Sequence, residues 1–132
     1  MSSKAKSITG WVMSGLVGLF MIVGSGSGKF FDFPGKAEMM DKLQIPTSLL
    51  PTVGVIEITV VVLFLIPRTS FLGAILTSGY LGGALWTHLR VGDTWFFPII
   101  IGVWMWVALG LRQPAIFKLA LGQSTDPKST AN

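Results

Sequence analysis

Four long apolar stretches constrain the fold of this chain more than any other feature of its sequence. They cover approximately residues 8–28, 48–66, 70–89 and 95–111, and each is close to the roughly 20 residues that cross a bilayer as a helix. Residues 60–66 are apolar without interruption, whereas transmembrane strands alternate apolar and polar positions. The sequence therefore predicts an all-α protein, a four-transmembrane-helix antiparallel bundle that forms one domain over residues 1–121.

The composition agrees with a membrane protein and excludes several kinds of site. Only 12% of the residues are charged, about half the roughly 25% that is usual for soluble domains. The chain has no Cys and one His, which excludes thiolate zinc sites, iron–sulfur clusters and a multi-histidine metal centre within one chain. The ten Lys and Arg are scattered singly and form no basic stripe, so the expected partner is the lipid bilayer and not nucleic acid.

The connections between the stretches differ in length. The first is long, residues 29–47, and residues 36–43 within it have the pattern of a short amphipathic helix that lies in the membrane interface. The other two, residues 67–69 and 90–94, are short and predict helical hairpins. A polar tail, residues 122–132, is expected to be disordered.

Basic residues set the expected orientation. Lys4 and Lys6 precede the first stretch and small residues follow it, as in a secretory signal, but we expect this segment to be retained. One side would hold Lys4, Lys6, Arg68, Arg112, Lys118 and Lys128, and the other Lys29, Lys36, Lys42 and Arg90. This excess of six over four predicts a multi-pass protein of the inner cell membrane with both termini in the cytoplasm.

Glu57 is the most informative single residue. It lies near the middle of the second stretch with no other charge close in sequence, and a charge at that depth costs several kcal/mol. Two interpretations remain open at this stage. Glu57 is either a protonatable group or ligand anchor inside the bundle, or a protonated carboxyl that joins helices by hydrogen bonding.

A polar stripe on the third stretch adds further candidates, Tyr80, Thr87 and His88. With a rise of about 1.5 Å per residue, Glu57 and Tyr80 fall at nearly the same depth and His88 roughly 10 Å nearer the outer surface. This predicts a proton path or a polar slot, although a lone interfacial His also bonds headgroups or loop carbonyls. Trp86, Trp104 and Trp106 are candidate walls for a flat apolar ligand such as a quinone, the alternative being lipid-facing Trp.

Glycines supply two short patterns. Gly79 and Gly83 have the spacing that lets helices approach closely, either within the chain or in a homo-oligomer. Residues 24–29, Gly-Ser-Gly-Ser-Gly-Lys, lack the Gly and hydroxyl positions of a phosphate-binding loop, at Val23 and Phe30. They are expected to be the fraying end of the first helix.

The sequence resembles the DoxX-like family of small four-helix membrane proteins. The resemblance rests on residues 54–57 (Gly-Val-Ile-Glu), Pro67, residues 73–74 (Gly-Ala) and residues 83–88 (Gly-Ala-Leu-Trp-Thr-His), with residues 44–46 (Gln-Ile-Pro) ending the aromatic first loop. It implies a link to thiosulfate:quinone oxidoreduction or to membrane complexes that handle oxidative and thiol stress. By resemblance, Glu57, Thr87 and His88 are the functional positions. Because the chain has no Cys, thiol chemistry would belong to a partner or substrate.

Three functions remain compatible with these residues, and no reaction is identified. The first is a redox-associated protein that holds a quinone or a similar molecule around Glu57, Tyr80 and His88, with a membrane or soluble redox partner. The second is a non-catalytic assembly or chaperone subunit of a membrane complex. The third is a proton-coupled exporter similar to the small multidrug transporters, in which, however, the essential Glu lies in the first helix.

Overall fold

A computed structural model describes residues 1–127, and every regular element in that range is helical. The elements in chain order are α1 (Ser3–Gly18), η1 (Leu19–Gly26), η2 (Ser27–Lys29), α2 (Lys36–Leu43), η3 (Thr47–Leu49), α3 (Leu50–Leu65), α4 (Ser70–Leu89), α5 (Phe97–Arg112) and α6 (Ala115–Ala120). The all-α prediction is confirmed for these residues. The end of the expected disordered tail lies outside the described residues.

The first helix is longer than the sequence predicted. The Ser2 side chain caps α1 by accepting a hydrogen bond from the backbone N–H of Ala5 at 3.1 Å. The helix then continues through the π-helical segment η1 and the 3₁₀ turn η2 as one rod, Ser3–Lys29. The interpretation of residues 24–29 as a fraying end is therefore wrong, and Lys29 belongs to the helix and not to the following connection. π-Helical turns within α-helices often mark functional sites.

The short helix α2 has the bounds that its amphipathic pattern predicted. It begins after Gly35, whose φ of 85° favours glycine, and ends at Gln44 in the left-handed conformation with φ 56°. The backbone N–H of Gln44 closes the last turn on Asp41 and Met40. Leu43 at this end is buried, so α2 is fixed against the rest of the protein.

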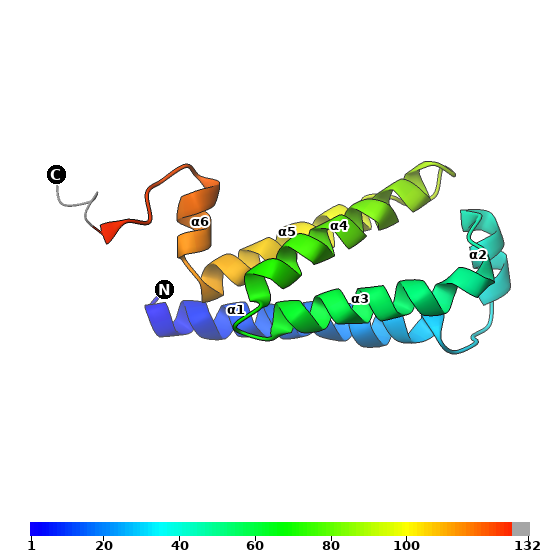
Figure 1. The fold of residues 1–132 in the computed structure, drawn as a ribbon, viewed down its shortest axis with the longest axis horizontal. Helices are drawn as coiled ribbons and strands as arrows, with labels where there is room; N and C mark the ends of the chain where they lie inside the picture. Colours follow the sequence, from blue (N-terminus) through cyan, green and yellow to red (C-terminus); the bar gives the residue numbers. More distant parts are fainter. Residues whose placement is uncertain (128–132) are drawn as a thin grey trace.

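The four long helices lie side by side as two pairs, α1 with α3 and α4 with α5 (Figure 1). α1 packs against α5, α3 against α4, and α4 against α5 (Figure 1). Between them lies a core whose members are fully buried: Val61, Phe64, Ala74, Met105, Ala108 and Leu109. Gly73 permits the closest approach, because a Cβ atom at this position would collide with the α3 backbone at Phe64.

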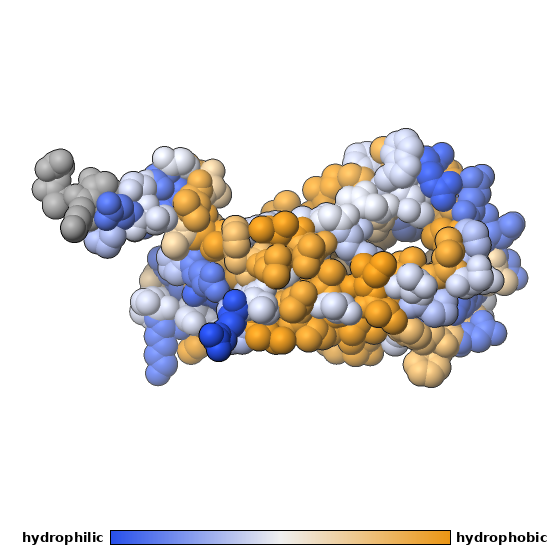
Figure 2. Space-filling view, viewed as in Figure 1, coloured by the Kyte–Doolittle hydropathy of each residue, from blue (hydrophilic) through white to orange (hydrophobic). Residues whose placement is uncertain are grey.

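The two pairs separate toward one end of the molecule. In Figure 1, α4 and α5 run away from α1 and α3 on the side where α2 lies, and the space-filling view has a hollow between the pairs there (Figure 2). At the opposite end the chain N-terminus, the α3–α4 turn and α6 come together. We call these the α2 end and the Arg112 end, the latter after the residue that joins the helices there.

The outer surface of the helices is strongly apolar, as Figure 2 shows for one face. Exposed side chains include Leu19, Phe20, Val55, Leu72, Ile100 and Val103. Two helices are long and apolar enough to cross a membrane, Ser3–Lys29 and Thr47–Leu65. α5 is apolar but has 16 residues, and α4 has four glycines and several polar residues among its 20. Helix length and composition alone thus support two of the four expected spans.

Candidate functional site

Glu57 forms a buried ion pair with Lys29. The Lys29 ammonium lies 2.5 Å from the Glu57 carboxylate, whose residue is 1% exposed. The same ammonium donates to the Ser25 hydroxyl at 3.0 Å, one helical turn earlier. Two opposite charges therefore neutralise each other inside an apolar protein, where an unpaired charge would be very costly. Sequence reasoning described Glu57 as isolated and missed its partner.

Close packing of the first helix on α3 brings Lys29 near Glu57. Gly26 and Gly54 allow the first helix and α3 to approach, since a Cβ atom at Gly26 would meet Ile58 and one at Gly54 would meet Phe30 and Lys29. The lysine stem can then reach from the end of the first helix to the second turn of α3. One feature of the sequence could have indicated this partner: Lys29 is the first basic residue after the apolar stretch, and it lies one helical turn after Ser25.

Tyr80 on α4 completes the charged group. Its hydroxyl faces the Glu57 carboxyl, and its side chain is partly buried. Tyr80 lies two turns along α4 from the close contact at Gly73, in the half of the molecule where the helix pairs separate. One turn away on the same helix, the Thr77 hydroxyl is fully buried and has no hydrogen-bond partner. Polar groups from the first helix, α3 and α4 thus meet inside the bundle.

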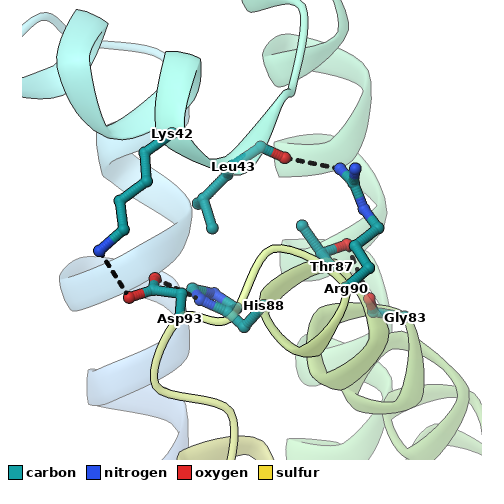
Figure 3. A network of polar contacts seen from close by, with 7 residues as sticks. All are labelled: Lys42, Leu43, Gly83, Thr87, His88, Arg90 and Asp93. Carbon is teal, nitrogen blue, oxygen red and sulfur yellow. Dashed lines mark hydrogen bonds and ion pairs between the residues drawn. The ribbon is translucent and has the colours of Figure 1, made fainter.

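His88 lies in the last turn of α4, at the α2 end, and has a carboxylate partner. Its Nδ1 atom is 3.0 Å from an Asp93 oxygen, and its ring meets Phe97 edge-on with the ring centroids 4.8 Å apart. The second oxygen of Asp93 accepts a hydrogen bond from Lys42 of α2 at 3.0 Å (Figure 3). Asp93 was not among the candidates, although its position five residues after His88 in a short turn favours this contact.

A second polar contact ties α2 to the end of α4. The Arg90 guanidinium donates to the Leu43 carbonyl at 2.6 Å and to the Gln44 side chain at 3.1 Å. Arg90 and Asp93 therefore hold the end of α2 from both sides of the turn after α4, as Figure 3 shows for Leu43 and Lys42. We call these contacts the α2 latch. It fastens α2 to the turn after α4, at the α2 end of the protein.

The electrostatics of the latch depend on Asp93. The hydrogen bond from Lys42, together with that from His88, lowers the pKa of the Asp93 carboxyl from its ordinary 3.8 to about 2. Asp93 is thus ionised throughout the physiological pH range, and it orients the His88 ring by accepting at Nδ1.

The other predicted site residues are dispersed. The Thr87 hydroxyl donates to the Gly83 carbonyl of its own helix at 2.8 Å (Figure 3). Trp86 is 64% exposed, and the Trp104 indole N–H donates to the Met13 carbonyl on α1 at 3.1 Å. The Trp106 indole donates to the Ser78 hydroxyl at 2.8 Å, on the α4–α5 side. None of the three indoles is brought against Glu57 by a contact that the structure records.

Gly79 and Gly83 face outward. A Cβ atom at either position, or at Gly82, would have no neighbour within 4 Å. These glycines consequently do not serve the packing of this chain against itself. The helix contact within the chain is made one and a half turns earlier, at Gly73.

Arg112 forms a second polar cluster that the sequence analysis treated only as a topological charge. Its guanidinium donates to the hydroxyls of Ser14 at 2.9 Å and Ser70 at 2.5 Å. The same group lies 3.7 Å above the centre of the Trp11 ring, a cation–π contact, and 5.2 Å from that of Phe64. One side chain at the end of α5 thereby joins α1, α3 and α4.

A comparison with protein families places this chain. Residues 12–111 match the model of the DoxX-like family, which is about three quarters of the sequence. The chain belongs to the DoxX-like family. The resemblance inferred from the residues is therefore confirmed, and family membership together with the two apolar helices supports a membrane protein. Searches of curated proteins and of solved structures found no match.

Proposed function

We propose that this DoxX-like protein crosses the inner membrane four times and binds a flat apolar molecule with carbonyl or hydroxyl oxygens, of the quinone class, between α3 and α4. The observation that carries the proposal is the buried Lys29–Glu57 pair, which faces Tyr80 on α4. Buried ionisable groups in membrane helices commonly mark ligand or proton pathways. Here Lys29 and Tyr80 supply hydrogen-bond donors and Glu57 supplies an acceptor within an apolar helical bundle.

The chemistry of these groups suits such a ligand. Lys29 and Tyr80 are donors for a carbonyl oxygen, and Glu57 is an acceptor for a hydroxyl. His88, held by Asp93, lies nearer the outer surface and is suited to exchange protons with water. In this proposal the residues contact the two ends of a mostly apolar ligand, which is the usual make-up of a small-molecule site.

The membrane arrangement follows from the exposed side chains and the charges. The outward faces of α4 and α5 carry Leu72, Ile75, Ile99, Ile100 and Val103, all exposed, so these helices also need an apolar surrounding. With both termini in the cytoplasm, the α2 latch lies on the outer side. The amphipathic α2 then rests in the outer interface.

Solvent extraction of the purified protein tests the ligand. Protein is purified in mild detergent as wild type, Glu57→Gln, Tyr80→Phe and Glu38→Gln, the last being an exposed carboxylate of α2. Bound quinone is extracted and quantified by chromatography with absorbance detection. We expect quinone in proportion to protein for wild type and Glu38→Gln, and its loss from Glu57→Gln and Tyr80→Phe. Equal amounts in all four, or none above a mock purification, would overturn the proposal.

An assembly subunit is the second candidate, and the outward-facing Gly79 and Gly83 favour it. Such glycines let another transmembrane helix approach closely, whether from a partner protein or from a second copy. In-membrane crosslinking of wild type and Gly79→Leu separates the two functions, because this substitution is away from Glu57. Loss of a crosslinked protein with retained quinone would assign the glycine face to assembly. A proton-coupled exporter is less well supported, since Lys29 neutralises the acid that would have to release protons.

A further inference from the structure

A groove separate from the Glu57 site lies where α4, α5 and α6 meet. It has a volume of about 510 Å³, and its lining includes Leu81, Gly82, Gly102, Val103, Phe117 and Ala120. Along α5 the lining runs from Pro98 to Val107, about 14 Å at the helical rise. The groove is therefore elongated along α5.

The residues that line the groove are mostly apolar. The polar groups in the lining, the Trp106 indole and the Ser78 hydroxyl, satisfy each other by a 2.8 Å hydrogen bond. Gly82 leaves its side of the groove open, because a Cβ atom there would have no neighbour within 4 Å. The groove thus offers a hydrocarbon surface without free hydrogen-bonding groups, which suits an alkyl chain and not a polar ligand.

The helix α6 closes the groove at the Arg112 end. Phe117 packs on Gly110 of α5, where even a methyl group would collide with the ring. Leu119 and Leu121, by contrast, are 58% and 73% exposed. Leu119 in α6 and Leu121 just after it thus lie beside an exposed lysine, Lys118. This combination is typical of a segment at a membrane interface.

Charge at this end is mostly positive. The termini and turns there carry Lys4, Lys6, Arg68, Arg112 and Lys118, and among the described residues the acidic group in these segments is Asp126, in the stretch after α6. Four of the other acidic residues lie at the α2 end: Asp32, Glu38, Asp41 and Asp93. An occupant whose hydrocarbon part fills the groove would thus have its head group beside cations, which favours a negative head group.

We propose that the groove binds one anionic glycerophospholipid, with an acyl chain along α4 and α5 and the phosphate at the basic Arg112 end. There the exposed Lys118, next in sequence to the lining residue Phe117, is the nearest basic residue in the chain to those that line the groove on α6. This site is distinct from the quinone site and depends only on the proposed orientation of the helices in the membrane. The lipid would seal the space between α6 and the α4–α5 pair. It would also attach α6 to the cytoplasmic leaflet, where anionic lipids are attracted to basic residues.

Native mass spectrometry of the detergent-purified protein tests the site. Phosphatidylglycerol and phosphatidylcholine with identical acyl chains are titrated against wild type, Lys118→Gln, Gly82→Phe and Gly79→Phe. The two glycine variants are a matched pair on one helix, since both positions have open space but only Gly82 lines the groove. Each variant is first shown to be monodisperse and helical by gel filtration and circular dichroism.

We expect one phosphatidylglycerol adduct on wild type and on Gly79→Phe, its loss from Gly82→Phe, and a roughly fivefold weaker adduct on Lys118→Gln. Equal binding of both lipids by wild type would overturn the proposal, as would equal adducts on the two glycine variants. Dimers that Gly82→Phe abolishes while the lipid adduct persists would show that a second copy covers the groove, and would also overturn it. The quinone content of these variants is independent of each of these outcomes.

Discussion

Breaking the Lys29–Glu57 pair should destabilise the protein far more than breaking a comparable pair on its surface. Lys29→Met leaves a carboxylate whose residue is 1% exposed without a counter-ion. Removing one partner of a buried pair costs about 3–5 kcal/mol. Because the Lys29 side chain is 17% exposed, we expect a cost near the lower end, about 3 kcal/mol, or a hundredfold change in the unfolding equilibrium.

The matched control is Lys42→Met, which breaks a pair whose lysine side chain is 63% exposed. That substitution should cost less than about 1 kcal/mol. A third variant, Lys29→Met with Glu57→Met, removes both charges and should recover most of the stability, because well-packed apolar residues replace buried pairs with little loss.

The assay is reversible unfolding in mixed detergent micelles, followed by tryptophan fluorescence, with the free energy of unfolding compared across the four proteins. If Lys29→Met is no worse than Lys42→Met, the pair does not hold the fold as described. Additive costs in the double variant would equally refute the reasoning, since they would mean that the two side chains do not depend on each other.

Three further predictions concern other parts of the molecule. Gly73→Ala should unfold the protein or force α3 and α4 apart, because the added methyl group would collide with the α3 backbone. Gly79→Ala, where the methyl group meets no neighbour, should leave the thermal midpoint unchanged. The thermal midpoints of the two variants are compared by light scattering during heating. The α2 latch should persist above about pH 4 and weaken as the pH falls toward 2. The reason is that the Asp93 carboxyl, whose pKa is lowered in the folded state, stabilises the fold above its unfolded pKa and loses this effect as it is protonated. Hydrogen exchange of the α2 amides measures this weakening, and in Asp93→Asn these amides should exchange fast at every pH. Arg112→Lys should cost about 2–4 kcal/mol, because a compact ammonium lacks the planar fork with which Arg112 reaches the Ser14 and Ser70 hydroxyls while it stacks on Trp11. Near-wild-type unfolding of this variant would contradict that geometry.

Hydrophobic runs and turn residues predicted the helices well, because those signals are local. The amphipathic pattern of residues 36–43 gave the bounds of α2, and the short connections gave the helical hairpins. Residues 24–29 were wrongly interpreted as a fraying helix end because residues 24–28 alternate glycine and serine, and glycine weakens an isolated helix. In the folded protein these small residues let the first helix lie close to α3, and packing outweighs propensity.

The pairing of charges was beyond the reach of the sequence. Depth along antiparallel helices placed Tyr80 level with Glu57, and the two residues do face each other. Lys29 was assigned to a loop, however, so nothing in the pattern joined it to a carboxyl 28 positions away. Arg112 was likewise considered only for topology, because its partners on α1 and α4 are 98 and 42 positions distant.

The Arg112 cluster has a consequence for how the protein is made. Ribosomes deliver helices to the membrane in chain order, so α1, α3 and α4 are synthesised before the side chain that fastens them together exists. The Lys29–Glu57 bond, between segments made early, forms first and can hold a partly synthesised chain. Arg112, in the last turn of α5, then joins the earlier helices to one another. A nascent polypeptide truncated before this turn would lack these contacts, and its helices would remain loosely associated.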